Sequence, residues 1–272
     1  MSALYRKLPA RLLLCPEAGL KNPSGMVYDQ HNKLLWICDM GNRRILQYEM
    51  ETGRVNEIPS NCGNGSKLGI PLAIALDADH RLVVTDVEHN TVFRFNGGWE
   101  DIWPSGAVSL DFPGSITCDA DRNIYIADFN NDRIVKAEPS GGISVMEDIH
   151  CKQPYGLYAH EDKLYVADTG NRRILRYHTH SGEREQDVIL NGFASAISIA
   201  LNNNGDIFYS ENRRLFLLPH GSQEPVLLID SKRWRDYSFA RLAHIGSLSP
   251  IGQDIILISD TVQNSIYEID IS

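Results

Sequence analysis

The chain has 272 residues, of which 43% are hydrophobic, so it is long enough to bury a substantial core. Its formal net charge of −9 argues against a nucleic-acid-binding protein, because such proteins usually carry a basic excess. The five cysteines share no spacing pattern, and their odd number leaves at least one unpaired. This usage favours a reducing compartment and predicts a cytoplasmic protein.

The first segment of the chain combines basic residues with a short apolar run. Arg6, Lys7 and Arg11 precede the run at residues 12–15. Four residues are too few for a signal-peptide core or a membrane span. We therefore expect no membrane association.

A repeated unit occupies the rest of the chain. The segment from Asp39 to Leu46 returns almost unchanged from Asp168 to Leu175, each time after a Pro-x-Gly segment and an apolar run. Six copies follow one another at spacings of 41 to 48 residues, with first strands expected to begin at Pro23, Pro71, Pro113, Pro154, Ala196 and His244. Because no linker interrupts the copies, residues 1–272 are predicted to form a single domain.

Each copy is predicted to contain four short strands. The second strand ends at an acidic residue in every copy: Asp39, Asp86, Asp128, Asp168, Glu211 and Asp260. A polar turn, a third apolar run and a weaker fourth run follow, except that the sixth copy ends after three strands. Four strands in about 40 residues are typical of a propeller blade. The sequence therefore predicts an all-β, six-bladed β-propeller of four-stranded blades.

The incomplete sixth copy gives the N-terminal segment a role. Residues 9–14 are predicted to supply its missing outer strand. That pairing would join the two ends of the chain in one blade and remove an exposed sheet edge.

The repeats resemble NHL repeats. The combination of Pro-x-Gly, an apolar strand, Asp and Asn-Arg-Arg-Ile matches best in copies one, three and four, and the similarity covers nearly the whole chain. Related propellers include those similar to SMP-30 and gluconolactonase. The resemblance implies the fold, whereas propellers of this kind include lyases, lactonases, synthases and non-catalytic binding modules.

The recurring acidic residue and the arginine that follows it, such as Asp39 and Arg44, are interpreted as structural. A feature repeated in symmetric positions favours bidentate Arg–carboxylate bonds that tie the blades together over one catalytic site. Positions that break the symmetry are better candidates for chemistry.

Three candidate catalytic residues break the symmetry on one face, here called the top, where the loops between blades converge. His244 is placed where other copies have Pro or Ala, His150 lies in the loop before the fourth copy, and Tyr155 follows Pro154 at the channel mouth. Histidine serves as acid, base or metal ligand near neutral pH. If a metal binds, His150 and His244 are its expected ligands, although catalytic zinc takes three protein ligands. The alternative for each is an ordinary polar loop residue.

Candidate ligand-binding residues come mainly from one loop. Residues 232–241 hold four cations and three aromatic rings, a combination suited to an anionic, partly apolar ligand. The alternative is a solvated cover over the junction of copies five and six. The predicted ligand-binding residues are Lys152, Arg233, Trp234, Arg235, Tyr237 and His89, of which His89 occupies the place of Asn42 and so favours an ordinary turn role.

The similarity to metal-dependent lactonases implies Glu, Asn and Asp ligands at the mouth of the inner strands. Hard cations require oxygen ligands. None of the aligned residues here is a carboxylate: Ser24, Leu72, Gly114, Tyr155, Ile197 and Ile245. A calcium-lactonase site is therefore disfavoured.

These features predict a small-molecule enzyme or ligand-binding propeller, of hydrolase, lyase or cyclase type, with its site at the top mouth of the central channel. No organic cofactor is expected, because the chain has no phosphate-binding or dinucleotide fingerprint, and a divalent metal stays open. The expected ligand is a small molecule, anionic if Arg235 or Lys152 contacts it. The alternative is a non-catalytic NHL interaction module for a protein segment or single-stranded RNA, with RNA disfavoured by the net charge of −9.

Overall fold

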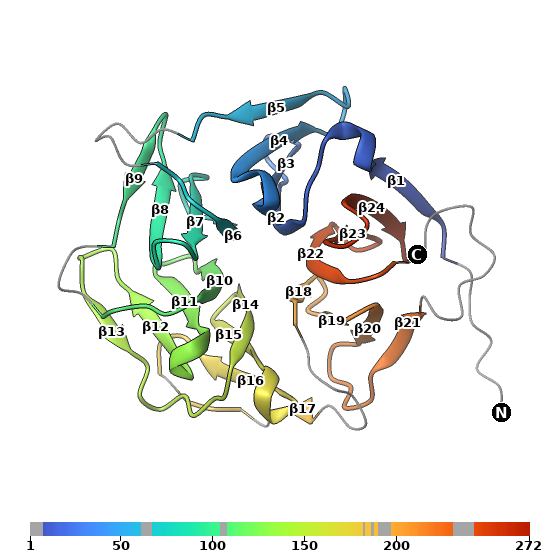
Figure 1. Ribbon diagram of the computed structural model, residues 1–272. Helices are drawn as coiled ribbons and strands as arrows, with labels where there is room; N and C mark the ends of the chain where they lie inside the picture. Colours follow the sequence, from blue (N-terminus) through green and yellow to red (C-terminus); the bar gives the residue numbers. More distant parts are fainter. Residues whose placement is uncertain are drawn as a thin grey trace.

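The computed structural model of the protein describes residues 8–60, 67–103, 108–181, 183–185, 188–189, 197–230 and 242–272. Six four-stranded sheets form a ring (Figure 1). The predicted six-bladed β-propeller of four-stranded blades is confirmed. In the described part of the chain, no helix has the length and apolar character needed to cross a membrane.

Each blade runs outward from an innermost strand, with antiparallel neighbours throughout. Blade 1 holds β2 (Pro23–Asp29), β3 (Leu34–Asp39), β4 (Arg44–Glu49) and β5 (Val55–Ile58); blade 2 holds β6 (Pro71–Leu76), β7 (Leu82–Asp86), β8 (Thr91–Phe95) and β9 (Trp99–Asp101). Blade 3 holds β10 (Pro113–Cys118), β11 (Ile124–Asp128), β12 (Arg133–Ala137) and β13 (Ile143–Val145); blade 4 holds β14 (Pro154–His160), β15 (Lys163–Asp168), β16 (Arg173–His178) and β17 (Val188–Ile189). Blade 5 holds β18 (Ile199–Leu201), β19 (Ile207–Glu211), β20 (Arg214–Leu218) and β21 (Val226–Asp230); blade 6 holds β22 (Ile245–Ile251), β23 (Ile255–Asp260) and β24 (Ser265–Asp270).

The fourth strand of blade 6 comes from the N-terminal segment, as predicted. β1 (Ala10–Leu14) pairs antiparallel with β24, with Ala10 opposite Ile269 and Leu12 opposite Tyr267. The blue and red ends of the chain therefore lie side by side in one sheet (Figure 1). This pairing covers the edge of β24 that would otherwise be open.

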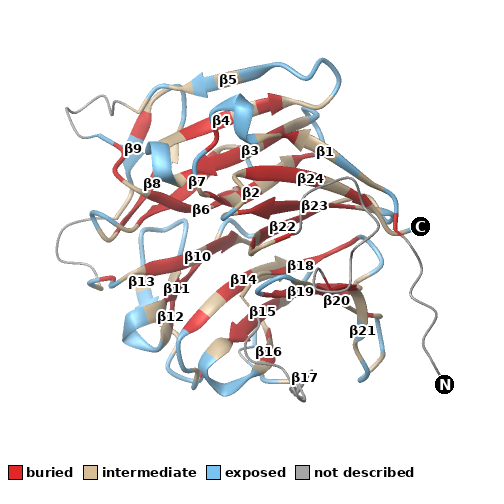
Figure 2. Cartoon of the chain, turned by 45° about the vertical axis from the view of Figure 1, so that its right-hand side comes forward, coloured by how far each residue is buried: buried red, intermediate tan, exposed pale blue. Residues whose placement is uncertain are grey.

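The core lies between the faces of neighbouring blades. The second strand of a blade is covered on both faces, so β7 and β11 are buried along their whole length and largely apolar before the acidic residue that ends each of them. Val83 and Val92 of blade 2 pack in one cluster with Ile126 and Val135 of blade 3. Figure 2 shows this burial in the inner and middle strands and exposure at the turns. Each such side chain contributes roughly 1.5–3 kcal/mol to folding.

The acidic residue at the end of each second strand is buried in all six blades. In blade 3, Asp128 Oδ2 accepts hydrogen bonds from Arg133 Nε at 2.7 Å and from Asn131 Nδ2 at 2.9 Å. Its Oδ1 accepts the backbone N–H of Asp111 at 2.7 Å. The predicted bidentate bond between blades is therefore wrong. The carboxylate instead holds the loop entering a blade against the turn of the same blade, because its second oxygen is engaged by that loop.

Neighbouring blades are joined one residue further along the turn. Three short 3₁₀ helices, Met40–Asn42, Phe129–Asn131 and Thr169–Asn171, lead into left-handed residues; a fourth, Pro16–Ala18, precedes blade 1. Left-handed Asn90 in blade 2 accepts the N–H of Phe112 at 2.9 Å, and left-handed Asp132 in blade 3 accepts that of Gln153 at 2.7 Å. Asn and Asp tolerate this backbone conformation better than most residues. In blades 2 and 3, the residue that turns the hairpin therefore also presents an acceptor to the next blade.

Candidate active site

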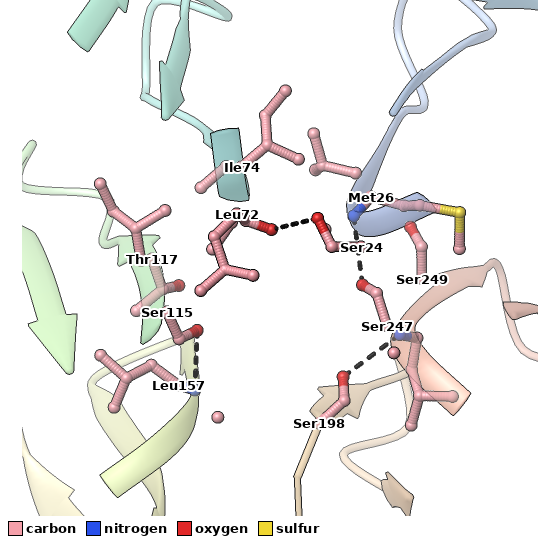
Figure 3. A pocket seen from close by; sticks show the side chains of 18 of the residues that line it. Ser24, Met26, Leu72, Ile74, Ser115, Thr117, Leu157, Ser198, Ser247 and Ser249 are labelled. Atoms are coloured by element: carbon pink, nitrogen blue, oxygen red, sulfur yellow. Dashed lines mark hydrogen bonds between the residues drawn. The ribbon is translucent and has the colours of Figure 1, made fainter. Parts of the chain in front are cut away.

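The innermost strands enclose a cavity of about 440 Å³ in the centre of the ring. Residues of β2, β6, β10, β14, β18 and β22 line it (Figure 3). Along β2 the lining extends from Ser24 to Tyr28, so the cavity follows most of the inner strand. Small-molecule pockets typically have volumes of about 300–1,000 Å³. The cavity is therefore of suitable size for such a ligand.

The strand register corrects the predicted alignment of blade 6. Pro23, Pro71, Pro113 and Pro154 each pair with the acidic residue of their own blade, whereas in blade 6 the residue paired with Asp260 is Ile245. The prediction that His244 takes the Pro or Ala position is therefore wrong by one residue, and His244 corresponds to Asn22. Gly246, not Ile245, then corresponds to Ser24. The error arose because the loop between the first two strands differs in length among blades.

His244 nevertheless reaches the cavity. Its Nδ1 lies 3.0 Å from Thr261 Oγ1, and its backbone N–H donates to Asp260 Oδ1 at 3.3 Å. Its carbonyl accepts the N–H of Thr261 at 3.0 Å. Both His244 and Thr261 line the cavity. These contacts fix the half-buried imidazole at the loop–strand junction, with one ring nitrogen occupied by the threonine.

Tyr155 lines the same cavity from the start of β14. Its ring packs edge-on against Phe129 with a centroid distance of 5.6 Å, and Phe129 contacts Phe112 at 5.7 Å. Burial raises the pKa of the Tyr155 phenol above its usual value, so the group keeps its proton at neutral pH. Tyr155 therefore offers a hydroxyl donor on an aromatic support.

Two other predicted residues lie elsewhere. His150 is exposed and does not line the cavity, and its carbonyl accepts a hydrogen bond from Arg173 Nη2 at 3.0 Å. Lys152 is also exposed and outside the lining, and its backbone N–H donates to Asp168 Oδ1 at 2.7 Å. The structure thus brings His244 and Tyr155 to one cavity but does not bring His150 or Lys152 to it.

The remaining ligand-binding candidates are of two kinds. His89 Nδ1 lies 2.9 Å from Asp86 Oδ2, as Asn42 Nδ2 lies 2.8 Å from Asp39 Oδ2 in blade 1. His89 therefore performs the turn role of asparagine. Arg233, Trp234, Arg235 and Tyr237 lie outside the described residues.

The donor set does not fit a hard divalent cation. At the mouth, the register places Ser24, Leu72, Gly114, Tyr155, Ile197 and Gly246 in equivalent positions, none of them a carboxylate. Within the described ranges, no group of three or more His, Cys, Asp or Glu residues is arranged to hold a metal ion. Calcium and magnesium need oxygen ligands, commonly carboxylates.

The described lining residues include no Asp, Glu, Lys or Arg. The titratable groups of the lining also include the phenols of Tyr28 and Tyr158 and the thiol of Cys118, and burial raises the pKa of the Cys118 thiol well above its usual value. The thiol is therefore protonated at neutral pH and is a poor nucleophile.

Hydroxyl side chains of the inner strands line the cavity too, and the sequence predictions missed them. Ser115 and Thr117, like Ser247 and Ser249, stand at alternate positions of otherwise largely apolar strands. That alternation was the available signal, because alternate residues of a strand share one face.

Comparison with known proteins supports the fold but does not identify a family. No protein-family model matches the chain, and no curated protein matches it. The resemblance to NHL repeats therefore stays a prediction. Solved structures with similar folds include a gluconolactonase from Xanthomonas campestris, with a TM-score of 0.77 and 14% identity over 98% of this chain and 91% of that one.

Two further solved structures span different kinds of protein. A streptogramin B lyase has a TM-score of 0.71 and 16% identity over 100% of both chains. A chain from a nidogen–laminin complex has a TM-score of 0.69 and 17% identity over 84% of each chain. At such low identities these similarities establish the propeller fold alone.

Proposed function

We propose that the protein is a small-molecule enzyme or ligand-binding propeller whose site is the mouth of the central cavity. The proposal rests on one observation: the side chains of His244 and Tyr155 both line the same cavity of about 440 Å³. The similarity in fold to a gluconolactonase and a streptogramin B lyase supports hydrolase or lyase chemistry.

The two side chains suit a reaction that moves a proton. His244 has Nδ1 against Thr261, so Nε2 is the nitrogen that would exchange a proton with a substrate. Tyr155, protonated and without a recorded hydrogen-bond partner for its hydroxyl in the described part of the chain, would donate to an oxygen that gains negative charge. Hydrolysis, elimination and cyclisation all need these two functions.

Ligand-dependent thermal unfolding across a panel of metabolites tests this proposal. A ligand at 100 times its Kd stabilises a protein by about 2.7 kcal/mol, which shifts the melting temperature measurably. For a substrate found this way, we expect His244→Ala to lower kcat by about 10²–10⁴-fold, the usual loss for a missing acid or base.

His150→Ala is the matched control, because that histidine is exposed and lies outside the cavity. It should keep both turnover and ligand-induced stabilisation, and both variants should melt close to the parent. Indifference of the parent protein to every compound, or equal activity in the two variants, would contradict the proposed site.

The second candidate is an interaction module that binds a protein segment. The likeness to a chain of a nidogen–laminin complex supports it at the level of the fold. A protein segment that binds across the top would compete with the small-molecule ligands for the mouth. Displacement of a bound ligand by such a segment would favour this candidate.

A further inference from the structure

The walls of the cavity carry hydroxyl groups that bridge neighbouring blades. Each of five hydroxyl oxygens accepts a backbone N–H from the inner strand of an adjacent blade. The pairs are Ser115 with Leu157 at 3.2 Å, Thr117 with Ala159 at 3.0 Å, Ser198 with Leu248 at 3.2 Å, Ser247 with Met26 at 3.1 Å and Ser249 with Tyr28 at 3.0 Å. Figure 3 shows several of these hydroxyls around the open centre of the ring. All five residues line the cavity.

Each bridging hydroxyl keeps a proton to donate. A hydroxyl has one donor and two lone pairs, so accepting one N–H leaves its O–H free. The structure records no protein acceptor for these five protons among the described residues, whereas Ser24 Oγ donates to the Leu72 carbonyl at 2.8 Å. Thr117, Ser247 and Ser249 are at least nine-tenths buried, with exposures of 8%, 9% and 6%. Buried donors rarely lack an acceptor, so something inside the cavity should accept these bonds.

The other lining residues make the cavity an unfavourable environment for an ion. The described lining residues carry no charged side chain, and apolar groups such as Ile74, Ile116 and Leu248 lie among the hydroxyls. Transfer of an unpaired ion into such surroundings is strongly unfavourable. An uncharged molecule with oxygen acceptors would satisfy both the hydroxyls and the apolar wall.

We propose that the cavity below the mouth is a subsite for an uncharged small molecule, or uncharged part of one, whose carbonyl or ether oxygens accept hydrogen bonds from Thr117, Ser247 and Ser249. This inference rests on the proposed function, since it assumes that the cavity takes a small molecule. The cationic loop at residues 232–241 suggested an anionic ligand. The cavity wall instead favours an uncharged ligand that carries hydrogen-bond acceptors.

Three probes that share a six-membered carbon ring test the inference in the intact protein: cyclohexanone, cyclohexanecarboxylate and cyclohexylammonium. Their binding is measured by saturation-transfer NMR and by titration at millimolar concentration. We expect cyclohexanone to bind at least tenfold more tightly than either ion, because only the ketone offers an acceptor without a charge.

Two matched variants then test whether a hydroxyl of the cavity wall contributes to cyclohexanone binding. Thr117→Val removes a hydroxyl from the cavity wall, whereas Thr85→Val removes one that accepts the N–H of Ala73 at 3.1 Å outside the lining. Both lose one buried N–H acceptor, so their stabilities should fall alike. Only Thr117→Val should weaken cyclohexanone binding, by about threefold to tenfold for one lost neutral hydrogen bond.

The outcomes separate this inference from the proposed function. Equal or tighter binding of an ionic probe, no binding of any probe, or equal weakening in both valine variants would overturn the inference. If metabolites still bind at the mouth in a His244-dependent way, the proposed function survives that result. The probe preference of the parent protein needs no variant, so the inference stays testable even if Thr117→Val fails to fold.

Discussion

At the scale of single residues, the buried carboxylates at the ends of the second strands have a structural role, because they hold loops and turns together. Asp86 accepts the N–H groups of Gly69 at 2.7 Å and Ile70 at 3.1 Å, and its Oδ2 lies 2.9 Å from His89 Nδ1. Burial acts to raise the pKa of Asp86, but the hydrogen bonds from His89, Gly69 and Ile70 outweigh it, and the net pKa is lowered from 3.8. The folded protein therefore favours the ionised form of this side chain.

A lowered pKa makes a prediction about acid stability. The contribution of Asp86 should be complete above its unfolded pKa near 3.8 and should be lost as the pH falls through its lower folded value. Asp86→Asn should therefore be less stable than the parent at pH 6, and the difference should shrink below pH 4. Urea unfolding from pH 2.5 to pH 6 measures this, with exposed Glu100→Gln as the control. A difference between parent and Asp86→Asn that is constant with pH would contradict the assignment.

The roles of some residues could be predicted from the sequence and those of others could not, for physical reasons. His89 could be assigned to a turn because it replaces Asn42 in a repeated pattern, and its ring makes the same contact to the acidic residue. His244 could be placed on the top face but not in its correct register, because loop lengths within blades vary. The contact between His244 and Thr261 links the residue before β22 to the residue after β23, 17 positions apart, so no local pattern encodes it.

At the scale of elements, β1 is the strand on which closure of the ring depends. It brings Leu14 into the cluster with Ile266, Leu257 and Met26, and it covers the edge of β24. Deletion of residues 1–15 should expose that edge and uncover several apolar side chains, each contributing roughly 1.5–3 kcal/mol. The loss is large against a typical stability of about 5–15 kcal/mol, so the shortened protein should aggregate or melt far below the parent.

Calorimetry and light scattering of the deletion variant measure this loss. Arg11→Ala is the control, since it removes only an exposed ion pair with Glu268 at 2.9 Å and should cost less than about 1 kcal/mol. Parent-like melting of the deletion variant would show that β24 needs no outer neighbour. The role of β1 was predictable from the sequence. The sixth copy lacks its fourth strand, and the chain begins with an apolar segment that no other copy uses.

At the scale of the whole molecule, repetition explains what the sequence could and could not predict. The ring was predictable, because each copy carries the same strand and turn signals. The side chains that line the central cavity were less predictable than its position, because its wall is assembled from six strands far apart in the chain. Ser247, for example, accepts the N–H of Met26 across 221 positions. Such contacts leave only a weak local trace, the alternate hydroxyls of the inner strands.

The same scale shows why the cavity suits a ligand. Most of its wall belongs to the innermost strands of six blades that are packed face to face, so the packed core sets most of its shape. Gly114 lies at the mouth, where an added Cβ would be 3.6 Å from the ring of Tyr155 and 3.6 Å from Phe129 Cβ. Those are ordinary contact distances, so a Cβ added at Gly114 clashes with neither neighbour.

Ligand binding with the mouth filled therefore tests the central claim most directly. Gly114→Leu places an apolar side chain beside Tyr155, and Gly98→Leu adds the same side chain where nothing lies within 4 Å of the new Cβ. Thermal unfolding with the compounds that stabilise the parent should show full stabilisation of Gly98→Leu and little or none of Gly114→Leu, with both variants melting near the parent when no ligand is present. Full ligand-induced stabilisation of Gly114→Leu would contradict a small-molecule site at the mouth of the channel.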